Sequence, residues 1–330
     1  MMKAIVNTEY GSPDVLQLKE VAKPAPKDNE VLIKVHAASV NAADWHLLRA
    51  DPFLVRLMVG GLLRPKITIL GADVAGRVEA VGRNVIEFQP GDEVFGDISA
   101  CGWGGFAEYV CALENALVLK PANMTFEQAA AVPLAGVTAL QGLRDKGQIR
   151  PGQKVLINGA SGGVGTFAVQ IARSFGAEVT AVCSTRNVDA VRAMGADHVI
   201  DYTQEDFTKN GQHYDLILAA NGYHPISDYK RALSPNGFYV MAGGSMPQMF
   251  QAMLLGPWIS MTGGRKMGNF LARPNKKDLT FMKELLEAGK VKPVIDRCYP
   301  LSEVAGAMRY IEEGHARGKV VITVEHNNKT

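Results

Sequence analysis

The sequence has few cysteines, little charge imbalance and no long uninterrupted hydrophobic run. Its 4 cysteines are scattered over 330 residues without the spacing of a zinc ribbon or a disulfide framework, which favours a reducing, cytoplasmic location. With 35 basic and 33 acidic side chains the net charge is only +2, so we expect no nucleic-acid partner. Arg56 interrupts the longest apolar stretch, and the first residues lack a signal-peptide core, so we expect no membrane partner either.

The length and residue pattern predict two domains. A chain of 330 residues is longer than one hydrophobic core usually serves. Residues 1–125 contain short apolar or alternating runs between glycine and proline turns, which indicates a mainly antiparallel β domain. Helical insertions are expected within it over 43–48 and 53–63. Residues 270–330 are expected to return to this domain and complete it.

Residues 126–269 show a different pattern, in which short strands alternate with helices. Such alternation predicts right-handed βαβ crossovers and a parallel sheet, so the fold class is α/β, a doubly wound Rossmann sheet beside the β domain. The predicted strands of this sheet cover 154–158, 178–183, 198–200, 215–219 and 237–242.

A glycine-rich turn follows the strand over 154–158. It has the pattern A-x-G-x-x-G, in which Ala160 replaces the first glycine and is tolerable if φ is negative there. Glycine lets the backbone approach a pyrophosphate, and the helix that follows offers free N–H groups and a positive dipole end. A tight turn without a ligand is the alternative. The residues predicted to bind the dinucleotide are Ser161, Gly162, Gly163, Val164 and Gly165.

The end of the second strand predicts which coenzyme is used. NAD sites usually place an acid there to accept the ribose hydroxyls, whereas this chain has Ser184 and, two residues later, Arg186. A hydroxyl and a guanidinium suit a 2′-phosphate, so NADPH is predicted rather than NADH. Tyr202 is a candidate neighbour of the adenosine phosphate, although ordinary packing would explain it equally well, and Arg186 is alternatively a solvated surface residue.

Several segments together resemble a known family over the whole chain. They are SVNAAD (39–44), LGADVAG (70–76), VG (81–82), GDEV (91–94), GGFAEY (104–109), GVTA (136–139), the glycine turn and GHARGKVV (314–321). The chain resembles the medium-chain dehydrogenase/reductase superfamily, and within it the zinc-independent quinone oxidoreductase (zeta-crystallin-like) group. The resemblance implies that the β domain is GroES-like and is completed by the C-terminal segment.

The resemblance also bears on metal binding. At the positions where zinc-dependent alcohol dehydrogenases carry zinc ligands, this chain has Asn41, Ala72, Asp73 and a residue near Leu134. Catalytic zinc needs three protein ligands, and this set does not supply them, so no metal is expected. A saturated carbonyl accepts hydride poorly without a Lewis acid, so the predicted substrate is a quinone or an α,β-unsaturated carbonyl.

The resemblance assigns further site residues. It places Asn41 and Thr138 beside the nicotinamide, where Asn41 would offer an amide N–H to a developing oxyanion or hold the ribose. Asp44 would support the site, with a helix cap as the alternative. No residue stands out as a proton donor, so water is expected to protonate the product. Further residues placed near the coenzyme are Gly243, Gly244, Arg273, Asn275 and Lys319.

Four aromatic residues in loops of the first domain are candidates for the walls of the substrate pocket. They are Tyr10, Trp45, Phe53 and Trp103. An aromatic slot would suit a flat quinone, while a place in the core or in a dimer interface is an equally good explanation.

Other readings of the sequence stay open. One is a zinc-type alcohol dehydrogenase. Another is a nucleotide-binding scaffold or RNA-associated crystallin-like protein with weak activity, against which the near-neutral charge argues. The resemblance implies a homodimer formed by edge strands of the Rossmann sheets, and the apolar segment 257–262 is the predicted edge strand.

Overall fold

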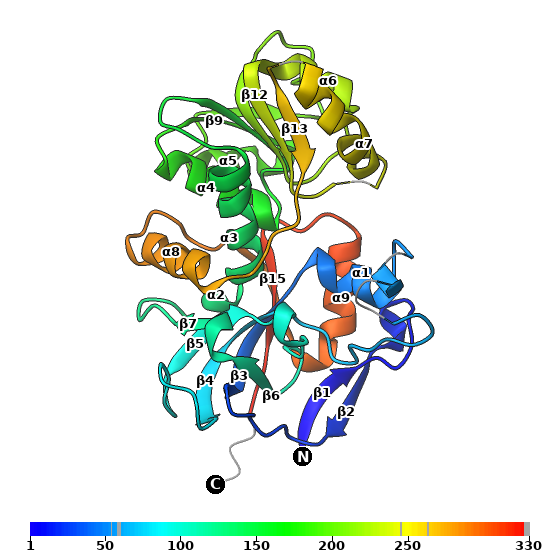
Figure 1. Ribbon diagram of the computed structural model, residues 1–330, viewed down its shortest axis with the longest axis vertical. Helices are drawn as coiled ribbons and strands as arrows, with labels where there is room; N and C mark the ends of the chain where they lie inside the picture. The colour runs from blue at the N-terminus through cyan, green and yellow to red at the C-terminus, as the bar shows by residue number, and fades with distance from the viewer. Residues whose placement is uncertain (54, 58–60, 245, 263, 327–330) are drawn as a thin grey trace. The chain divides into compact units, whose positions relative to one another are not determined.

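The computed structural model describes residues 1–326 except 54, 58–60, 245 and 263 (Figure 1). The chain divides into two compact units. The first comprises Met1–Leu134, Pro274–Lys283 and Pro293–Thr330, and the second comprises Ala135–Arg273 and Glu284–Lys292. Both units are therefore built from separate stretches of chain.

The first unit is built on a 7-stranded sheet in the order β14-β15-β3-β4-β5-β7, with β6 also paired to β3. Its pairs are antiparallel except β14 with β15, and a two-stranded β1–β2 sheet lies beside it. The strands are β1 (Met2–Val6), β2 (Gln17–Val21), β3 (Glu30–Val40), β4 (Asp73–Val81), β5 (Glu93–Asp97), β6 (Tyr109–Leu113), β7 (Leu117–Leu119), β14 (Ile295–Pro300) and β15 (Lys319–Thr323).

The register of strand β3 brings distant polar residues together. Ser39 pairs with Asp73 on β4, and Val40 pairs with Val320 on β15. The next residue after Val40 is Asn41, so Lys319 lies opposite it where β3 ends. The C-terminal strand therefore contributes to the site as well as to the sheet.

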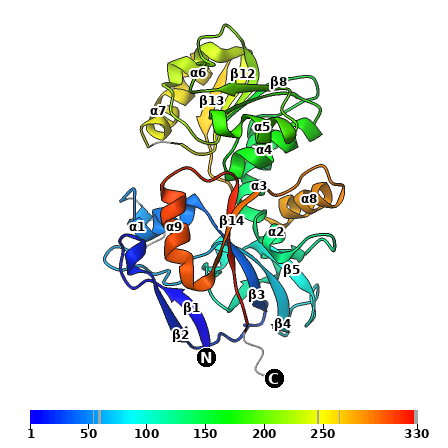
Figure 2. The same ribbon diagram turned by 180° about the vertical axis from the view of Figure 1, so that it is seen from behind.

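Helices cover this sheet and its ends. Helix α9 packs against α1 and against the β14–β15 pair (Figure 2). The predicted insertion over 43–48 is confirmed as α1, whereas the one over 53–63 falls partly on residues outside the described chain. The helices of this unit are α1 (Ala42–Arg49), α2 (Phe126–Ala130) and α9 (Val304–Glu312), while α3 (Pro133–Leu140) begins in it and α8 (Lys276–Glu287) contributes its first residues.

The second unit holds a 6-stranded parallel sheet in the order β10-β9-β8-β11-β12-β13. This is the doubly wound order of a dinucleotide-binding fold, so the predicted α/β class is confirmed. The strands are β8 (Lys154–Asn158), β9 (Glu178–Cys183), β10 (His198–Asp201), β11 (Tyr214–Ala219), β12 (Leu233–Met241) and β13 (Lys266–Asn269).

The core of the second unit is apolar and aromatic. Side chains from α6 and α7, such as Tyr229 and Ile259, pack on alternate residues of the sheet, such as Ile217 and Tyr239. The remaining elements are a π-helical turn (Gln141–Lys146), α4 (Gly163–Ser174), α5 (Val188–Ala193), α6 (Ile226–Ala232) and α7 (Met246–Thr262).

The prediction that residues 257–262 form an edge strand is wrong. These residues lie in helix α7, and the edge strands of the described sheet are β10 and β13. Short apolar runs do not reveal their period, so an apolar helix end and a strand look alike in the sequence.

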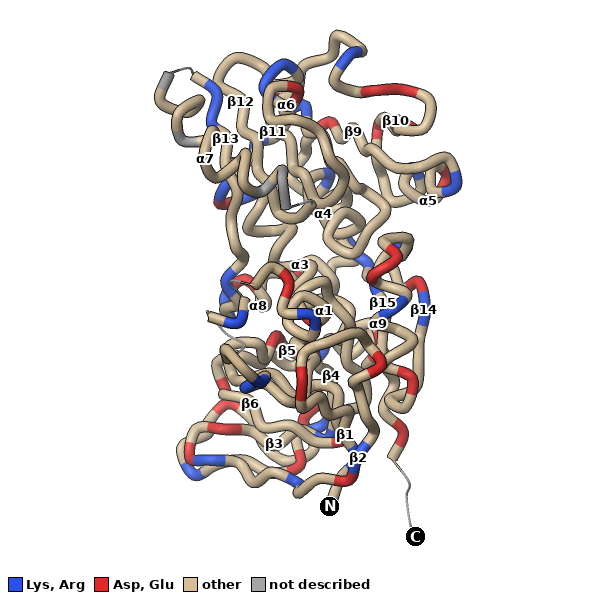
Figure 3. Tube along the Cα trace, turned by 90° about the vertical axis from the view of Figure 1, so that its right-hand side faces the viewer, with Lys and Arg blue, Asp and Glu red and all other residues tan. Residues whose placement is uncertain are grey.

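Basic and acidic residues both occur in each of the two units (Figure 3). Residues 232–264, which include all of β12 and all of α7, contain no charged side chain. Within the described residues, no helix combines the length and hydropathy needed to span a bilayer.

Candidate functional site

The glycine-rich turn joins β8 to α4 at the carboxyl end of the parallel sheet. Gly159 carries a positive φ of 81°, so the left-handed conformation falls on a glycine and not on Ala160, whose φ is negative. The Ala160 side chain is buried, and its N–H donates to the carbonyl of Val182 on the neighbouring strand, at 3.0 Å. Alanine therefore fits the first position of the pattern without strain.

Two glycines in this turn have different surroundings. A Cβ on Gly165 would lie 2.1 Å from the carbonyl oxygen of Gly159, so only glycine lets helix α4 pack against the turn. A Cβ on Gly162 would meet nothing closer than 3.6 Å, so the space beside this residue is open. Gly162 is the N-cap of α4, and the first N–H groups of a helix have no partner within the helix. The turn thus offers free amides, a positive dipole end and open space, which fits a pyrophosphate.

Of the residues predicted to contact a 2′-phosphate, Ser184 and Arg186 follow strand β9, and Tyr202 follows β10. Ser184 is half-buried, Arg186 is exposed and the Tyr202 side chain is 60% exposed. Asp201 ends strand β10, and its carboxylate accepts hydrogen bonds from the Thr203 amide at 3.0 Å and hydroxyl at 2.8 Å. A hydrogen bond from the Thr185 side chain is the main cause that lowers the pKa of Asp201, and the two Thr203 bonds lower it further, so the acid is already engaged by its neighbours.

A buried polar network lies beneath the ends of the next strands. Asn158, the last residue of β8, donates from its side chain to the hydroxyl of Tyr229 at 2.8 Å. Gln248 on α7 donates to the hydroxyl of Tyr239 at 2.8 Å. Burial raises the pKa of Tyr229 to about 12. These tyrosines therefore stay neutral and act as structural hydrogen-bonding groups rather than as acids.

Gly243 and Gly244 lie directly after β12, at the same carboxyl edge of the sheet. A Cβ on Gly243 would lie 2.5 Å from the carbonyl oxygen of Ala220, and Gly244 has a φ of 130°. Backbone geometry alone therefore requires glycine at both positions, whether or not a coenzyme binds there.

The first unit contains a buried cluster around the Asp73 carboxylate. One carboxylate oxygen accepts from the hydroxyl of Ser39 at 2.8 Å and from the side-chain amide of Asn41 at 3.0 Å. The other accepts from the backbone N–H of Leu134 at 2.9 Å. The ammonium of Lys319, only 3% exposed, donates to Asn41 Oδ1 at 2.5 Å and to Asp73 Oδ2 at 3.4 Å. Lys319 and Asp73 are thus a buried ion pair bridged by Asn41.

This arrangement changes the chemistry available to Asn41. Its amide nitrogen donates to Asp73 and, at 3.3 Å, to the carbonyl of Ser39, so both amide hydrogens are already used. Asn41 therefore has no free N–H for an oxyanion in this conformation. An ammonium has three donors, and Lys319 has two acceptors among the described residues, so Lys319 is the better electropositive group.

Asp44 lies beside this cluster in the first turn of α1. Its carboxylate accepts from the backbone N–H of Asn41 at 2.7 Å and from that of Gly71 at 2.9 Å. Burial raises the pKa of Asp44 to about 7, against the lowering effect of these two bonds. Burial also raises the pKa of Asp97 to about 6, and the nearby charge of Asp73 adds to that increase. Asp44 thus joins the start of α1 to the segment before β4.

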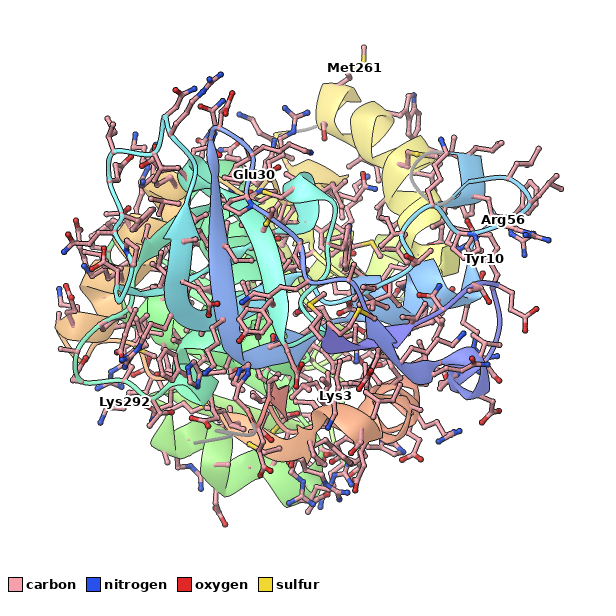
Figure 4. The ribbon with its side chains drawn as sticks, turned by 90° about the horizontal axis from the view of Figure 1, so that it is seen from below. Lys3, Tyr10, Glu30, Arg56, Met261 and Lys292 are labelled. Carbon is pink, nitrogen blue, oxygen red and sulfur yellow. The ribbon has the colours of Figure 1, made fainter. Side chains whose placement is uncertain are left out.

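Two of the four candidate pocket residues, Tyr10 and Phe53, share the neighbour Arg56. Tyr10 donates from its hydroxyl to the carbonyl of Gly61 at 2.6 Å, and the guanidinium of Arg56 lies 4.6 Å from its ring centre (Figure 4). The same guanidinium lies 5.5 Å from the ring of Phe53, which is exposed. Arg56 therefore links these two aromatic residues, and nothing in its sequence context indicated this role.

The two tryptophans are placed differently. Trp45 stacks on His46 with ring centres 3.8 Å apart, and Trp103 has a φ of 68°. Both side chains are half-buried against the hydrophobic core of the first unit. Their packing agrees with the alternative reading of these residues as part of the core.

Other predicted residues have structural partners of their own. Thr138 is buried on α3. Asn275 caps α8, since its side-chain oxygen accepts from the Asp278 N–H at 2.8 Å and its amide donates to the Asp278 carboxylate at 2.7 Å. The backbone of Arg273 is held by the side chain of Gln141 through bonds of 2.8 and 3.0 Å.

Over the part of the chain that the structure describes, no group of three or more histidine, cysteine, aspartate or glutamate side chains is arranged to hold a metal ion. Some positions that correspond to zinc ligands by resemblance lie in the buried cluster around Asp73, here named the Lys319 cluster. Asn41 and Asp73 bind Lys319 directly, and the backbone N–H of Leu134 donates to Asp73.

Comparisons with known proteins agree with this architecture. Residues 27–122 match the alcohol dehydrogenase GroES-like domain, and residues 194–322 match the zinc-binding dehydrogenase family. The chain is 35% identical to the chloroplast envelope quinone oxidoreductase homolog of Arabidopsis thaliana, with 98% of each chain covered. It is 36% identical to the NADPH-dependent alkenal/one oxidoreductase, chloroplastic, of Arabidopsis thaliana, covering 97% of this chain and 79% of that one. Among solved structures, the quinone oxidoreductase from Coxiella burnetii aligns with a TM-score of 0.86 and 32% identity, covering 98% and 99% of the two chains.

Proposed function

Because the chain belongs to the quinone oxidoreductase group of the medium-chain dehydrogenase/reductase superfamily, we propose that it is an NADPH-dependent reductase of quinones or α,β-unsaturated carbonyls. The observation that carries the proposal is the glycine turn, with its open space at Gly162 and the free first-turn amides of α4. The relatives named for quinone and alkenal/one reduction support the class of acceptor. When bound, the nicotinamide supplies the hydride, and the chain supplies position and charge.

The Lys319 cluster supports a conjugated acceptor and a metal-free mechanism. Asp73 holds the Lys319 ammonium in a buried place, and Asn41 fixes its direction through Oδ1. We assign to Lys319 the stabilisation of negative charge that develops on the acceptor oxygen, because a cation in a dry site acts strongly over short range. Asn41 then acts as a positioning residue, and Thr138 keeps its proposed place beside the nicotinamide.

The choice of NADPH over NADH rests on Ser184 and Arg186. A hydroxyl at the end of β9 replaces the usual acid, and the exposed guanidinium two residues later adds a cation for a phosphate.

Steady-state oxidation of NADPH with a panel of quinones, alkenals and simple ketones tests the proposed function. We expect turnover with conjugated acceptors, little with simple ketones, and a higher kcat/KM for NADPH than for NADH. Absence of turnover with every acceptor, together with retained coenzyme binding, would favour a nucleotide-binding scaffold. Absence of coenzyme binding would overturn the proposal altogether.

Metal analysis of the purified protein separates the proposal from a zinc-type alcohol dehydrogenase. We expect activity to survive extensive dialysis against a strong chelator, because Lys319 occupies the polar cluster formed by the corresponding positions. One firmly held zinc ion per chain, with activity lost on its removal, would favour the alternative.

A homodimer in the cytoplasm is also part of the proposal. The open outer edge of β13 supports pairing between two copies. All four cysteines are free thiols, the state expected in a reducing compartment. Light scattering of the purified protein and microscopy of a tagged chain test the two parts separately.

A further inference from the structure

Asn187 connects the pyrophosphate turn to the predicted 2′-phosphate site. It is only 5% exposed and occupies the N-cap position of α5, where an asparagine side chain normally accepts a backbone hydrogen bond. Its side chain makes no such bond. Instead, Nδ2 donates to the hydroxyl of Ser161 at 3.0 Å and to that of Ser184 at 3.1 Å. One buried amide thus joins the turn after β8 to the loop after β9, although α4 and β9 separate them in the chain.

These two bonds determine what the hydroxyl groups can do next. A hydroxyl has one hydrogen to donate and an oxygen that accepts. Because each oxygen accepts from Asn187, each hydrogen is left to point toward another acceptor. Within the described residues, neither hydroxyl donates to a protein group. Ser161 and Ser184 are therefore oriented as donors, which is the polarity that phosphate oxygens require.

We propose that Asn187 is the positioning residue that orients Ser161 toward the diphosphate and Ser184 toward the 2′-phosphate, and so determines the preference for NADPH. The inference rests on the proposed coenzyme function. Ser161 would meet a group that both coenzymes share, whereas Ser184 would meet a group that only NADPH carries. Loss of Asn187 therefore weakens both coenzymes but weakens NADPH more.

The test measures dissociation constants for NADPH and NADH by isothermal titration. We expect Asn187→Ala to lower the NADPH-to-NADH preference about tenfold, or about 1.4 kcal/mol. Ser184→Ala should lower the preference to a similar extent, and the double variant should lower it no further, because the two residues act through one contact. Asn210→Ala removes an amide bonded to Glu205 and serves as a matched control that should keep the native preference.

Asn187→Asp provides a second variant that fills the same space. Its carboxylate would accept from both hydroxyls and turn them away from the phosphates, so the preference for NADPH should fall even where Asn187→Ala folds poorly. An equal effect of Asn187→Asp in a Ser184→Ala background would show that the added charge alone is responsible, and would overturn the inference.

The remaining outcomes separate the inference from the proposed function. A native protein that prefers NADPH, with the same preference in every Asn187 variant, would overturn the inference and leave the proposed function standing. If the double variant lowers the NADPH-to-NADH preference by the sum of the two single effects, the inference is also overturned. A native protein that binds neither coenzyme would overturn the proposed function, and the inference with it.

Discussion

Lys319 donates a hydrogen bond from its buried ammonium to the side-chain oxygen of Asn41, 278 positions earlier in the chain. The pairing of β15 with β3 puts the two residues opposite each other, and Asp73 on β4 supplies the counter-charge. Three strands from both ends of the first unit's sequence thus meet at one buried cation. The stability of the unit and the proposed role of Lys319 therefore depend on the same contact.

Lys319→Met should destabilise the protein by about 3–5 kcal/mol, because it leaves the buried Asp73 carboxylate without its counter-ion. The double variant Asp73→Asn with Lys319→Met should recover part of that loss, since neither of the two positions then carries an unpaired charge. Urea unfolding of the three proteins measures the effect. A Lys319→Met variant that unfolds at the native urea concentration would show that the ion pair contributes nothing.

Asp44 should make stability depend on pH in an unusual direction. Its pKa in the folded chain is about 7, above the value of about 4 expected when unfolded, so the folded state holds the proton more tightly. The free energy of unfolding should therefore fall as the pH rises from about 4 to about 7, by at most about 1.4 kcal/mol per pH unit from this group.

Asp44→Asn isolates this contribution, because Asp97 titrates in the same direction and is present in both proteins. Urea unfolding of the native chain and of Asp44→Asn across this pH range should show the native chain losing stability relative to the variant. Parallel profiles for the two proteins would mean that Asp44 does not titrate there.

Arg186→Ala should weaken NADPH by about 1–3 kcal/mol and leave NADH nearly unchanged, because only NADPH carries the phosphate that the guanidinium would bind. Titration with each coenzyme at low and high salt measures this, and the difference should shrink as salt increases. Arg192→Ala, on the following helix and paired with Asp189, is the matched control. An equal loss for both coenzymes would place the 2′-phosphate elsewhere.

Substitutions at two glycines of the turn should distinguish an effect on folding stability from an effect on coenzyme affinity. Gly165→Ala forces a Cβ to within 2.1 Å of the Gly159 carbonyl oxygen and should destabilise the second unit by about 1–3 kcal/mol or more. Gly162→Ala adds a methyl group to open space, so the fold should persist while both coenzymes bind more weakly. Unfolding and binding measured on both variants check this, and unchanged coenzyme affinity in Gly162→Ala would show that no ligand approaches that backbone.

Strand positions in the second unit followed directly from local pattern. The predicted strands 154–158 and 178–183 coincide with β8 and β9, because buried parallel strands appear as short apolar runs bounded by turns. The segment 257–262 was equally apolar and proved to be helical. Local hydrophobicity identified buried strands in the first case only, because Ile259 is buried while Trp258 and Met261 of the helical segment are exposed.

The site could be predicted only in part. Ser184 stood out because its position in the βαβ pattern normally holds an acid. Asn187 did not, because an asparagine at a helix start is ordinary and only its actual hydrogen bonds to Ser161 and Ser184 show otherwise. Arg56 was likewise noticed as an interruption of an apolar run and not as the neighbour of Tyr10.

The sequence by itself determined the α/β class and the glycine turn, since these depend on periodicity and backbone conformation within short stretches of chain. Tertiary structure alone decided that Asn41 gives its amide hydrogens to Asp73 and Ser39 and accepts from Lys319. A hydrogen bond depends on distances of a few tenths of an ångström between atoms whose residues are far apart in the chain, and strand register rather than residue type sets those distances.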